Sequence, residues 1–385
     1  MTMIGTRWRT PDADVMVSAP VDAAVHALSI GHMVVVVDDE SDSDEGDLVI
    51  AAAHATPQRV AFMMRHTGGI LCVPMPASDL DRLCLPPMVA TGEHPHSAAH
   101  TVSVNARAGI ASGNSATDRS RTISLLADAQ TQPQDLSRPG HVFPLRTVDG
   151  GVLRRAGHAE AAVDLVRMAG LPPAAVLGGV VDDDGEVAKG NRLRAFVAAH
   201  RVPVVGMAEL IAYRRRTEQL VEFKAATRLP TRFGEFRVHG FRSVLDDREH
   251  IALVMGDPAD HGASPILVRV HSECLLGNAF GSRLCDCGDR LDSALQMIAD
   301  EGRGVVVYLR GCKGSCRGLL AGSASNPEGA EAPDRRDYGV GAQILADLGV
   351  RRMRLMTNSP VKRIGLDAFG LEVTGTKRLP SMSTS

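Results

Sequence analysis

Two valine-rich runs constrain most strongly what this chain can fold into: MVVVV at 33–37 and VVVYL at 305–309. Continuous apolar runs of this length predict strands that are buried on both faces, because a half-exposed strand would alternate apolar with polar residues. Both runs are far too short to span a bilayer. Strand-like and helix-like segments alternate in both halves of the chain. The pattern predicts an α/β and α+β class of fold, as two mixed α/β domains in tandem.

Further elements follow from local signals. Apolar residues recur at helical spacing over 56–66, where Thr56 is the expected N-cap, and over 290–300 and 339–349. Strand-like segments are expected at 48–53, 233–241, 249–256 and 265–271. The alternation breaks near Thr217, where a charged stretch begins. We therefore expect a flexible N-terminal arm at 1–20, a first domain at 21–216 and a second domain at 217–385.

Composition narrows the class of protein. The formal charge is −3 over 385 residues, whereas a groove that follows nucleic-acid phosphates needs a clear basic excess, so we expect no nucleic-acid partner. The first residues lack the apolar core of a secretory signal, and no membrane segment is expected. Five of the seven cysteines lie between Cys274 and Cys316, and such a cluster in a cytoplasmic protein is more often a metal or catalytic site than a set of disulfides. A cytoplasmic enzyme is the class that we expect.

The cysteines Cys274, Cys285 and Cys287 lie in the segment SECLLGNAFGSRLCDCGDRLD. Three thiolates suit zinc and leave one tetrahedral position open, which is typical of a catalytic ion. The alternative is three buried structural cysteines. Cys312 and Cys316 follow in a separate loop, where one of them would close the site as a fourth ligand or both would be free surface thiols.

At this point the second half resembles GTP cyclohydrolase II. The resemblance rests on RVHSEC at 269–274, CDCG at 285–288, YLRG at 308–311, DRRDYGVGAQIL at 334–345 and TNSPVKRIGL at 357–366. It implies an enzyme that needs Zn²⁺, and Mg²⁺ with the nucleotide, to open the imidazole ring of GTP with release of formate and pyrophosphate.

The resemblance also implies roles for individual residues. Cys274, Cys285 and Cys287 would hold zinc, Asp334 would be the general base, and Arg336 would attack the α-phosphate. Nucleotide contacts would come from Arg269, Val270, His271, Ser272, Glu273, Arg290, Thr357 and Lys362. The family is commonly dimeric, so a homodimer is expected.

Three departures from the family pattern bear on this activity. The loop that follows the YLRG strand has Lys313 where the family has Glu, and Ser315 where it has a nucleotide-contacting Arg. Arg290 stands where Gln is usual. A segment rich in Gly, Ser and Ala at 321–333 replaces most of the helix and loop that carry the family's catalytic Tyr. Guanine selection depends on buried polar contacts, so these changes would weaken or redirect nucleotide recognition.

A second resemblance rests on the segments 34–53, 65–74, 113–123, 138–146 and 150–165. Over these segments the first half resembles 3,4-dihydroxy-2-butanone 4-phosphate synthase, which implies conversion of ribulose 5-phosphate to a four-carbon phosphate and formate with magnesium. His158 matches the metal-binding histidine, His141 a histidine that is important for catalysis, and Asp47 a substrate-contacting aspartate. Arg155 opens a substrate-binding run.

Three positions that the synthase reaction needs have changed. Asp42 replaces an Arg, Ser43 replaces the metal-binding Glu, and Gly179 replaces a catalytic Glu. The loss of a metal ligand, a phosphate contact and a general base predicts that Asp47, His141, Arg155 and His158 are remnants of an inactive synthase site.

The leading hypothesis is therefore a riboflavin-pathway protein with a zinc-dependent GTP cyclohydrolase II-like domain joined to a decayed synthase domain. One alternative is a non-catalytic paralogue or scaffold with a structural zinc. The other is a cyclohydrolase that acts on a different purine nucleotide.

Overall fold

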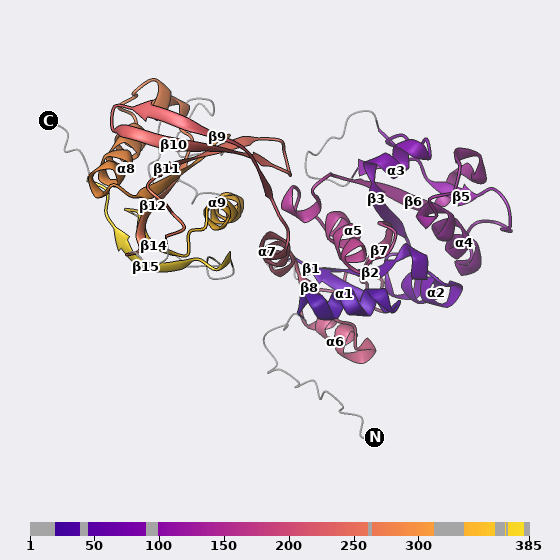
Figure 1. The fold of residues 1–385 in the computed structure, drawn as a ribbon. Coiled ribbons are helices and arrows are strands. Elements are labelled where there is room, and N and C mark those ends of the chain that lie inside the picture. The colour runs from indigo at the N-terminus through magenta and orange to yellow at the C-terminus, as the bar shows by residue number, and fades with distance from the viewer. Residues whose placement is uncertain are drawn as a thin grey trace, which may run out of the picture. The chain divides into compact units, whose positions relative to one another are not determined.

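A computed structural model of the chain describes residues 20–38, 45–89, 99–260, 264–311, 335–358, 366 and 369–380, without the side chains of 335–338. The chain divides into two units, residues 1–213 and 214–385, and the division falls within α7 (Met207–Thr217). Figure 1 shows unit 1 in indigo to magenta and unit 2 from pink to yellow. Each unit is built on one mixed sheet, so the predicted class of two mixed α/β domains is confirmed. No helix within the described ranges is long and apolar enough to cross a membrane.

The sheet of unit 1 has eight strands among the described residues, in the order β4-β6-β3-β7-β2-β1-β8, with β5 paired to β6. Its strands are β1 (Val34–Val37), β2 (Gly46–Ala51), β3 (Cys72–Pro76), β4 (Ala99–His100), β5 (Val104–Ala106), β6 (Leu136–Thr147), β7 (Ala175–Gly179) and β8 (Val204–Gly206). Its helices besides α7 are α1 (Val21–Ser29), α2 (Pro57–His66), α3 (Ala77–Arg82), α4 (Ala116–Ala127), α5 (His158–Met168) and α6 (Asn191–His200).

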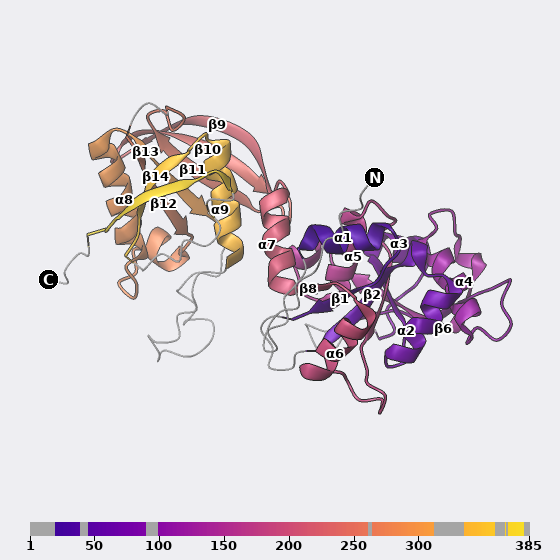
Figure 2. The ribbon, with the colours of Figure 1, turned by 90° about the horizontal axis from the view of Figure 1, so that it is seen from below.

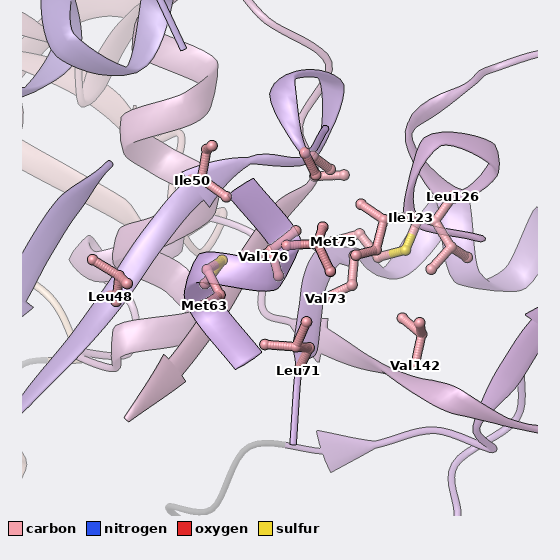
Figure 3. Packing of buried hydrophobic residues seen from close by; sticks show 14 of the residues in the cluster. Leu48, Ile50, Met63, Leu71, Val73, Met75, Ile123, Leu126, Val142 and Val176 are labelled. Carbon is pink, nitrogen blue, oxygen red and sulfur yellow. The ribbon is translucent and has the colours of Figure 1, made fainter. Parts of the chain in front are cut away.

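The valine run of β1 is buried on both faces, as its sequence predicts. Val35 and Val37 point into the apolar cluster that α2, α4 and α6 cover, part of which Figure 3 shows around Met63 and Ile123. Val34 and Val36 point to the opposite face, where α1 and α5 pack. Alternate residues of a strand face opposite sides, so β1 joins the two halves of a three-layer unit.

Helix α2 begins where its cap predicts. The Thr56 hydroxyl accepts a hydrogen bond from the Arg59 amide at 3.4 Å, and Pro57 occupies the first turn. The strand expected at 48–53 runs as β2 from Gly46 and ends at Ala51, where a short 3₁₀ turn follows.

Unit 2 has a seven-stranded sheet among the described residues, in the order β15-β14-β12-β13-β11-β10-β9. Its elements are β9 (Val221–Thr231), β10 (Gly234–Ser243), β11 (Glu249–Met255), β12 (Ile266–Ser272), α8 (Cys287–Glu301), β13 (Gly304–Leu309), α9 (Arg335–Asp347), β14 (Arg352–Met356) and β15 (Glu372–Lys377). Helices α8 and α9 cover opposite faces of this sheet, as Figure 2 shows.

Unit 2 adds to the sequence expectations at two places. The charged stretch after Thr217 continues into β9, an edge strand whose side chains are almost all exposed and which the sequence did not predict. An edge strand with two solvated faces carries no apolar alternation, and Pro230 is tolerated there because one side of the strand has no partner. The helix expected at 290–300 is present as α8, which begins three residues earlier, at Cys287. This earlier start places the third cysteine on a helix.

Candidate functional site

The three cysteines Cys274, Cys285 and Cys287 come together in unit 2. Their sulfur atoms all lie within 4.8 Å of one another, and the Cys274 and Cys285 Sγ atoms are 3.7 Å apart. Cys274 is buried, while Cys285 and Cys287 are half-buried. Within the described ranges, this is the one group of three or more Cys, His, Asp or Glu side chains close enough to share an ion.

Three local elements bring these thiols together. β12 ends at Ser272, and Cys274 then caps a π-helical turn at Leu275–Ala279, where its Sγ accepts a hydrogen bond from the Gly277 amide at 3.3 Å. π-Helical turns are rare and occur often at functional sites. The chain returns through Cys285 to the first turn of α8, which carries Cys287.

Glycines allow this close approach of the two segments. A Cβ at Gly277 would lie 2.8 Å from the Cys285 Sγ, and a Cβ at Gly288 would lie 2.5 Å from the Gly277 carbonyl oxygen. Any larger residue at either position would force the π-turn and α8 apart. The small residues of the motif are therefore needed for the thiol geometry itself.

The electrostatics of the thiol cluster favour a cation. Burial, together with Cys274 and Cys285, raises the pKa of Cys287 to about 12. A thiolate is the form that binds metal, and neighbouring thiols oppose its formation unless a positive ion compensates their charge. The same surroundings raise the pKa of Tyr308 to about 12, through burial and then the negative charges of Glu273 and Cys274.

The segment Arg269–Glu273 resembles a nucleotide-binding run, but its residues in β12 point alternately to opposite faces of the sheet. Arg269 and His271 lie on one face, and Val270 packs on the other against the cluster under α9. His271 is only 2% exposed and stacks on Tyr308, with ring centroids 5.6 Å apart. Val270 and His271 are thus occupied by the packing of the unit. Their role as nucleotide contacts stays a prediction.

Three other residues with expected nucleotide contacts have protein partners. The Arg269 Nη1 donates to the Met356 carbonyl at 2.9 Å. The Glu273 carboxylate accepts from the Gly311 amide at 2.8 Å, and Arg290 pairs with Asp286 at 2.5 Å. These contacts fix the side chains near the ends of β12 and α8.

The remaining candidates on the second unit are placed only in part. Ser272 ends β12, and the Thr357 amide donates to the Lys377 carbonyl at 3.0 Å just after β14. Arg336 belongs to the first turn of α9, but its side chain is outside the description. Asp334, Lys362, Cys312, Cys316, Lys313 and Ser315 lie outside the described residues, so their roles stay predictions.

A second cluster lies in unit 1 around His158, the first residue of α5. Its Nδ1 is 2.8 Å from an Asp47 carboxylate oxygen, and its Nε2 is 3.4 Å from Asp38. Burial lowers the pKa of His158, but the hydrogen bond and charge of Asp47, with the charge of Asp38, outweigh burial and hold that pKa above its usual value. A cationic imidazole must lose its proton before it can bind a metal.

The other residues of unit 1 that match the synthase differ in whether they lie beside His158. Gly179 pairs with Asp47 across β7 and β2, and a Cβ there would lie 3.5 Å from an Asp47 carboxylate oxygen. The missing glutamate therefore belongs beside Asp47 and His158. Arg155 pairs with the buried Glu160 at 2.5 Å, whereas the His141 backbone amide donates to Asn105 at 2.9 Å. Asp42 and Ser43 lie outside the described residues.

Sequence reasoning overlooked three residues of these clusters. Asn278 and Tyr308 belong to the surroundings of the thiols, and Asp38 to those of His158. Asp38 could have been found, because it directly follows a buried strand, where functional carboxylates often lie. Asn278 gives no comparable signal, since its importance depends on partners from separate segments.

Comparison with known proteins gives a consistent result for both halves. A family model of 3,4-dihydroxy-2-butanone 4-phosphate synthase matches residues 22–213, and one of GTP cyclohydrolase II matches residues 222–378. The chain is 52% identical over 377 residues to the riboflavin biosynthesis protein RibBA of Rhodococcus jostii, covering 94% of this chain and 90% of that protein. It is 51% identical over 376 residues to RibBA of Salinispora tropica, covering 94% of each.

Solved structures agree with this likeness. RibBX of A. baumannii, described as a two-domain 3,4-dihydroxy-2-butanone 4-phosphate synthase, matches with a TM-score of 0.73 at 32% identity, over 94% of this chain and all of that one. A 3,4-dihydroxy-2-butanone 4-phosphate synthase in complex with two magnesium ions matches with a TM-score of 0.50 at 38% identity, over 52% of this chain and 98% of that one.

Proposed function

The chain belongs to the riboflavin-biosynthesis family that joins a 3,4-dihydroxy-2-butanone 4-phosphate synthase domain to a GTP cyclohydrolase II domain, and we propose that its second unit is a zinc-dependent hydrolase that opens the imidazole ring of GTP. Formate and pyrophosphate would be the products released. The thiol cluster at Cys274, Cys285 and Cys287 is the observation that carries this proposal.

The cluster fits zinc in chemistry and in size. Zinc–sulfur bonds of about 2.3 Å in a tetrahedron place neighbouring sulfurs about 3.8 Å apart, and the Cys274 and Cys285 sulfurs are separated by 3.7 Å. Three protein ligands leave one position for water, as in catalytic zinc sites. Zinc held by these three thiolates would supply a hydroxide nucleophile near neutral pH.

The surrounding side chains supply positioning and charge. Arg269, fixed by the Met356 carbonyl, lies on the sheet face that also carries His271, and its guanidinium suits a phosphate oxygen. Glu273 is fixed at the end of β12 by the Gly311 amide. From the resemblance, Asp334 would move the proton, Arg336 would attack the α-phosphate, and Thr357 and Lys362 would complete the nucleotide contacts. Mg²⁺ would accompany the triphosphate.

For unit 1, the matching family supports a synthase, and nothing in the comparisons supports a lost activity. The expectation of decay rests only on Asp42, Ser43 and Gly179. His158 lies against Asp47 and Asp38 in the structure, and carboxylates are ligands of the kind that hold magnesium. Turnover of ribulose 5-phosphate by the full chain, measured with magnesium, decides between an active and a decayed synthase.

In the second candidate function, unit 2 does not act on GTP. It is favoured by Lys313 and Ser315, which replace residues that the resemblance assigns to the nucleotide, and by the A. baumannii relative, which is described as a two-domain synthase. In this form the zinc site would be structural, or the substrate would be another purine nucleotide. A homodimer and a cytoplasmic location are part of the proposal and follow from the family.

The test is formate release from GTP by the full chain with zinc and magnesium. Cys285→Ser removes one ligand, and Cys84→Ser is the matched control, because Cys84 is an exposed thiol of unit 1. We expect formate from the wild type and from Cys84→Ser, and none from Cys285→Ser. Folded, zinc-loaded protein that releases no formate from GTP would contradict the cyclohydrolase, and release from other purine nucleotides would identify the redirected enzyme.

A further inference from the structure

One side chain connects the segments that carry the first and third thiols. Asn278, in the π-helical turn, accepts a hydrogen bond at its Oδ1 from the Cys274 amide at 2.9 Å. The same oxygen lies 3.2 Å from the His271 Nε2 and 3.3 Å from the Tyr308 hydroxyl. Its Nδ2 donates to the Cys287 carbonyl at 3.2 Å. Asn278 therefore joins β12, β13, the π-turn and the first turn of α8.

The backbone determines how this amide is oriented. The Cys274 N–H can only donate and the Cys287 carbonyl can only accept, so Oδ1 must face Cys274 and Nδ2 must face Cys287. It follows that the His271 Nε2 carries a proton and that the Tyr308 hydroxyl donates to Oδ1. The register of the parallel strands β12 and β13 places His271 directly beside Tyr308, so both donors reach the amide from one face of the sheet.

We propose that Asn278 is a positioning residue that sets the geometry of the thiol cluster. It binds the backbone of Cys274 on one side and that of Cys287 on the other, and thereby fixes the separation of the first and third thiols. This proposal rests on the proposed function of unit 2 only in taking the bound ion to be zinc. The arrangement of the thiols themselves is a property of the chain.

Only an amide meets all the requirements at this position. A carboxylate keeps the acceptor for Cys274, His271 and Tyr308, but it cannot donate to the Cys287 carbonyl and adds a negative charge beside the thiols. An apolar side chain removes the acceptor that the N–H of Cys274 has in Asn278, and the loss of a buried hydrogen bond is costly. Asn278→Asp and Asn278→Ala therefore remove different parts of the same network.

The experiment compares these variants in the full chain by two measurements. The first is the affinity for zinc by chelator competition, with cobalt(II) as a spectroscopic probe of tetrahedral thiolate ligation. The second is the alkylation rate of Cys274 and Cys287 in metal-free protein, followed by peptide mass spectrometry. Gln343→Ala is the matched control, because Gln343 is a buried amide of the same unit that accepts from the Leu220 amide at 2.6 Å and donates to the Glu218 carbonyl, both outside the thiol segments.

We expect Asn278→Ala to weaken zinc binding roughly 10- to 100-fold, as the loss of an outer-shell partner commonly does, to alter the cobalt spectrum and to speed alkylation of Cys274 and Cys287. Asn278→Asp and Tyr308→Phe should weaken binding less. Gln343→Ala should lower the melting temperature without changing either thiol measurement.

The two proposals fail in different ways. Wild-type protein that binds neither zinc nor cobalt contradicts the proposed zinc enzyme, while the alkylation rates still test Asn278. Alkylation rates and metal affinity that are equal in wild type and Asn278→Ala overturn the role of Asn278. If Asn278→Ala does not fold, the alkylation rates and the metal affinity are compared between wild type, Asn278→Asp and Tyr308→Phe. Unchanged rates and affinity in both variants overturn the role of Asn278.

Discussion

Replacement of Gly277 by alanine tests whether the thiol cluster binds metal in the geometry of the structure. The added Cβ would lie 2.8 Å from the Cys285 Sγ, 3.0 Å from the Cys287 Cβ and 3.3 Å from the Cys274 Sγ. Ordinary contact begins at 3.4 Å, so the Cys285 sulfur would have to move by 0.6 Å, the difference between 3.4 and 2.8 Å. A zinc–ligand distance tolerates only about 0.2 Å.

The magnitude follows from the cost of overpacking. One extra carbon in a well-packed region typically costs about 1–3 kcal/mol. At about 1.4 kcal/mol for each tenfold change, this cost corresponds to zinc binding that is weaker by roughly 5- to 150-fold if it falls on the bound state. The backbone at Gly277 lies outside the left-handed region, so strain of the main chain adds nothing. We therefore expect a loss of metal affinity without unfolding of the unit.

The assay is zinc affinity by competition with a chromophoric chelator, with circular dichroism as the check on folding. Gly375→Ala is the matched control, because Gly375 lies in β15 of the same unit and a Cβ there meets nothing within 4 Å. Its zinc affinity should equal that of the wild type. The reasoning is refuted if folded Gly277→Ala protein binds zinc as tightly as the wild type, since the three sulfurs could not then surround the ion as the structure places them.

Two further predictions concern other residues. Gly179→Glu restores a carboxylate beside Asp47. Because a positioned general base contributes about 10²–10⁴-fold, this variant should raise the turnover of ribulose 5-phosphate at least about tenfold, and Gly179→Gln should not. Equal rates in the two variants and the wild type would show that this position does not limit the synthase. Burial lowers the pKa of His250; Asp246 opposes this effect, and Arg248 and Arg310 add to it. The unfolded state therefore takes up the proton first, and stability falls as pH drops below about 6.5, by at most about 1.4 kcal/mol per pH unit for one proton. His250→Gln, which keeps an acceptor for the Arg310 amide, should show a shallower loss between pH 7.5 and 5 in denaturant titrations, and an unchanged slope would contradict this assignment.

The fold could be predicted where burial leaves a pattern in the sequence. The valine runs of β1 and β13 are buried on both faces, and the cap at Thr56 marks the start of α2. β9 could not be found in this way, because nearly all its side chains are exposed and it is held by pairing with β10. Strand pairing of this kind depends on the backbone of a neighbour, and local periodicity carries no record of it.

In the candidate site, too, local sequence signals were predictive and contacts between distant segments were not. The spacing of Cys274, Cys285 and Cys287 predicted a cluster, and the structure brings the three sulfurs together. The segment 269–273 suggested a continuous nucleotide-binding run, but a strand presents alternate residues to opposite faces, so Val270 turns to the core. Asn278 was overlooked because its partners come from segments separated along the chain and become neighbours only after β12 and β13 pair.

We expect zinc binding and nucleotide binding to depend on different residues of this chain. The three candidate zinc ligands lie within residues 274–287, from the cap of the π-turn to the first turn of α8, and the Asn278 amide joins the backbones of Cys274 and Cys287. The substitutions that depart from the cyclohydrolase pattern at Lys313 and Ser315 fall elsewhere in the sequence, at positions that the family uses for the nucleotide. Zinc affinity should therefore be unaffected when Lys313→Glu and Ser315→Arg are introduced together, whereas GTP binding should tighten. If zinc affinity changed and GTP binding did not, residues 313–315 would act on the metal site, and the expected separation of zinc binding from nucleotide binding would be wrong.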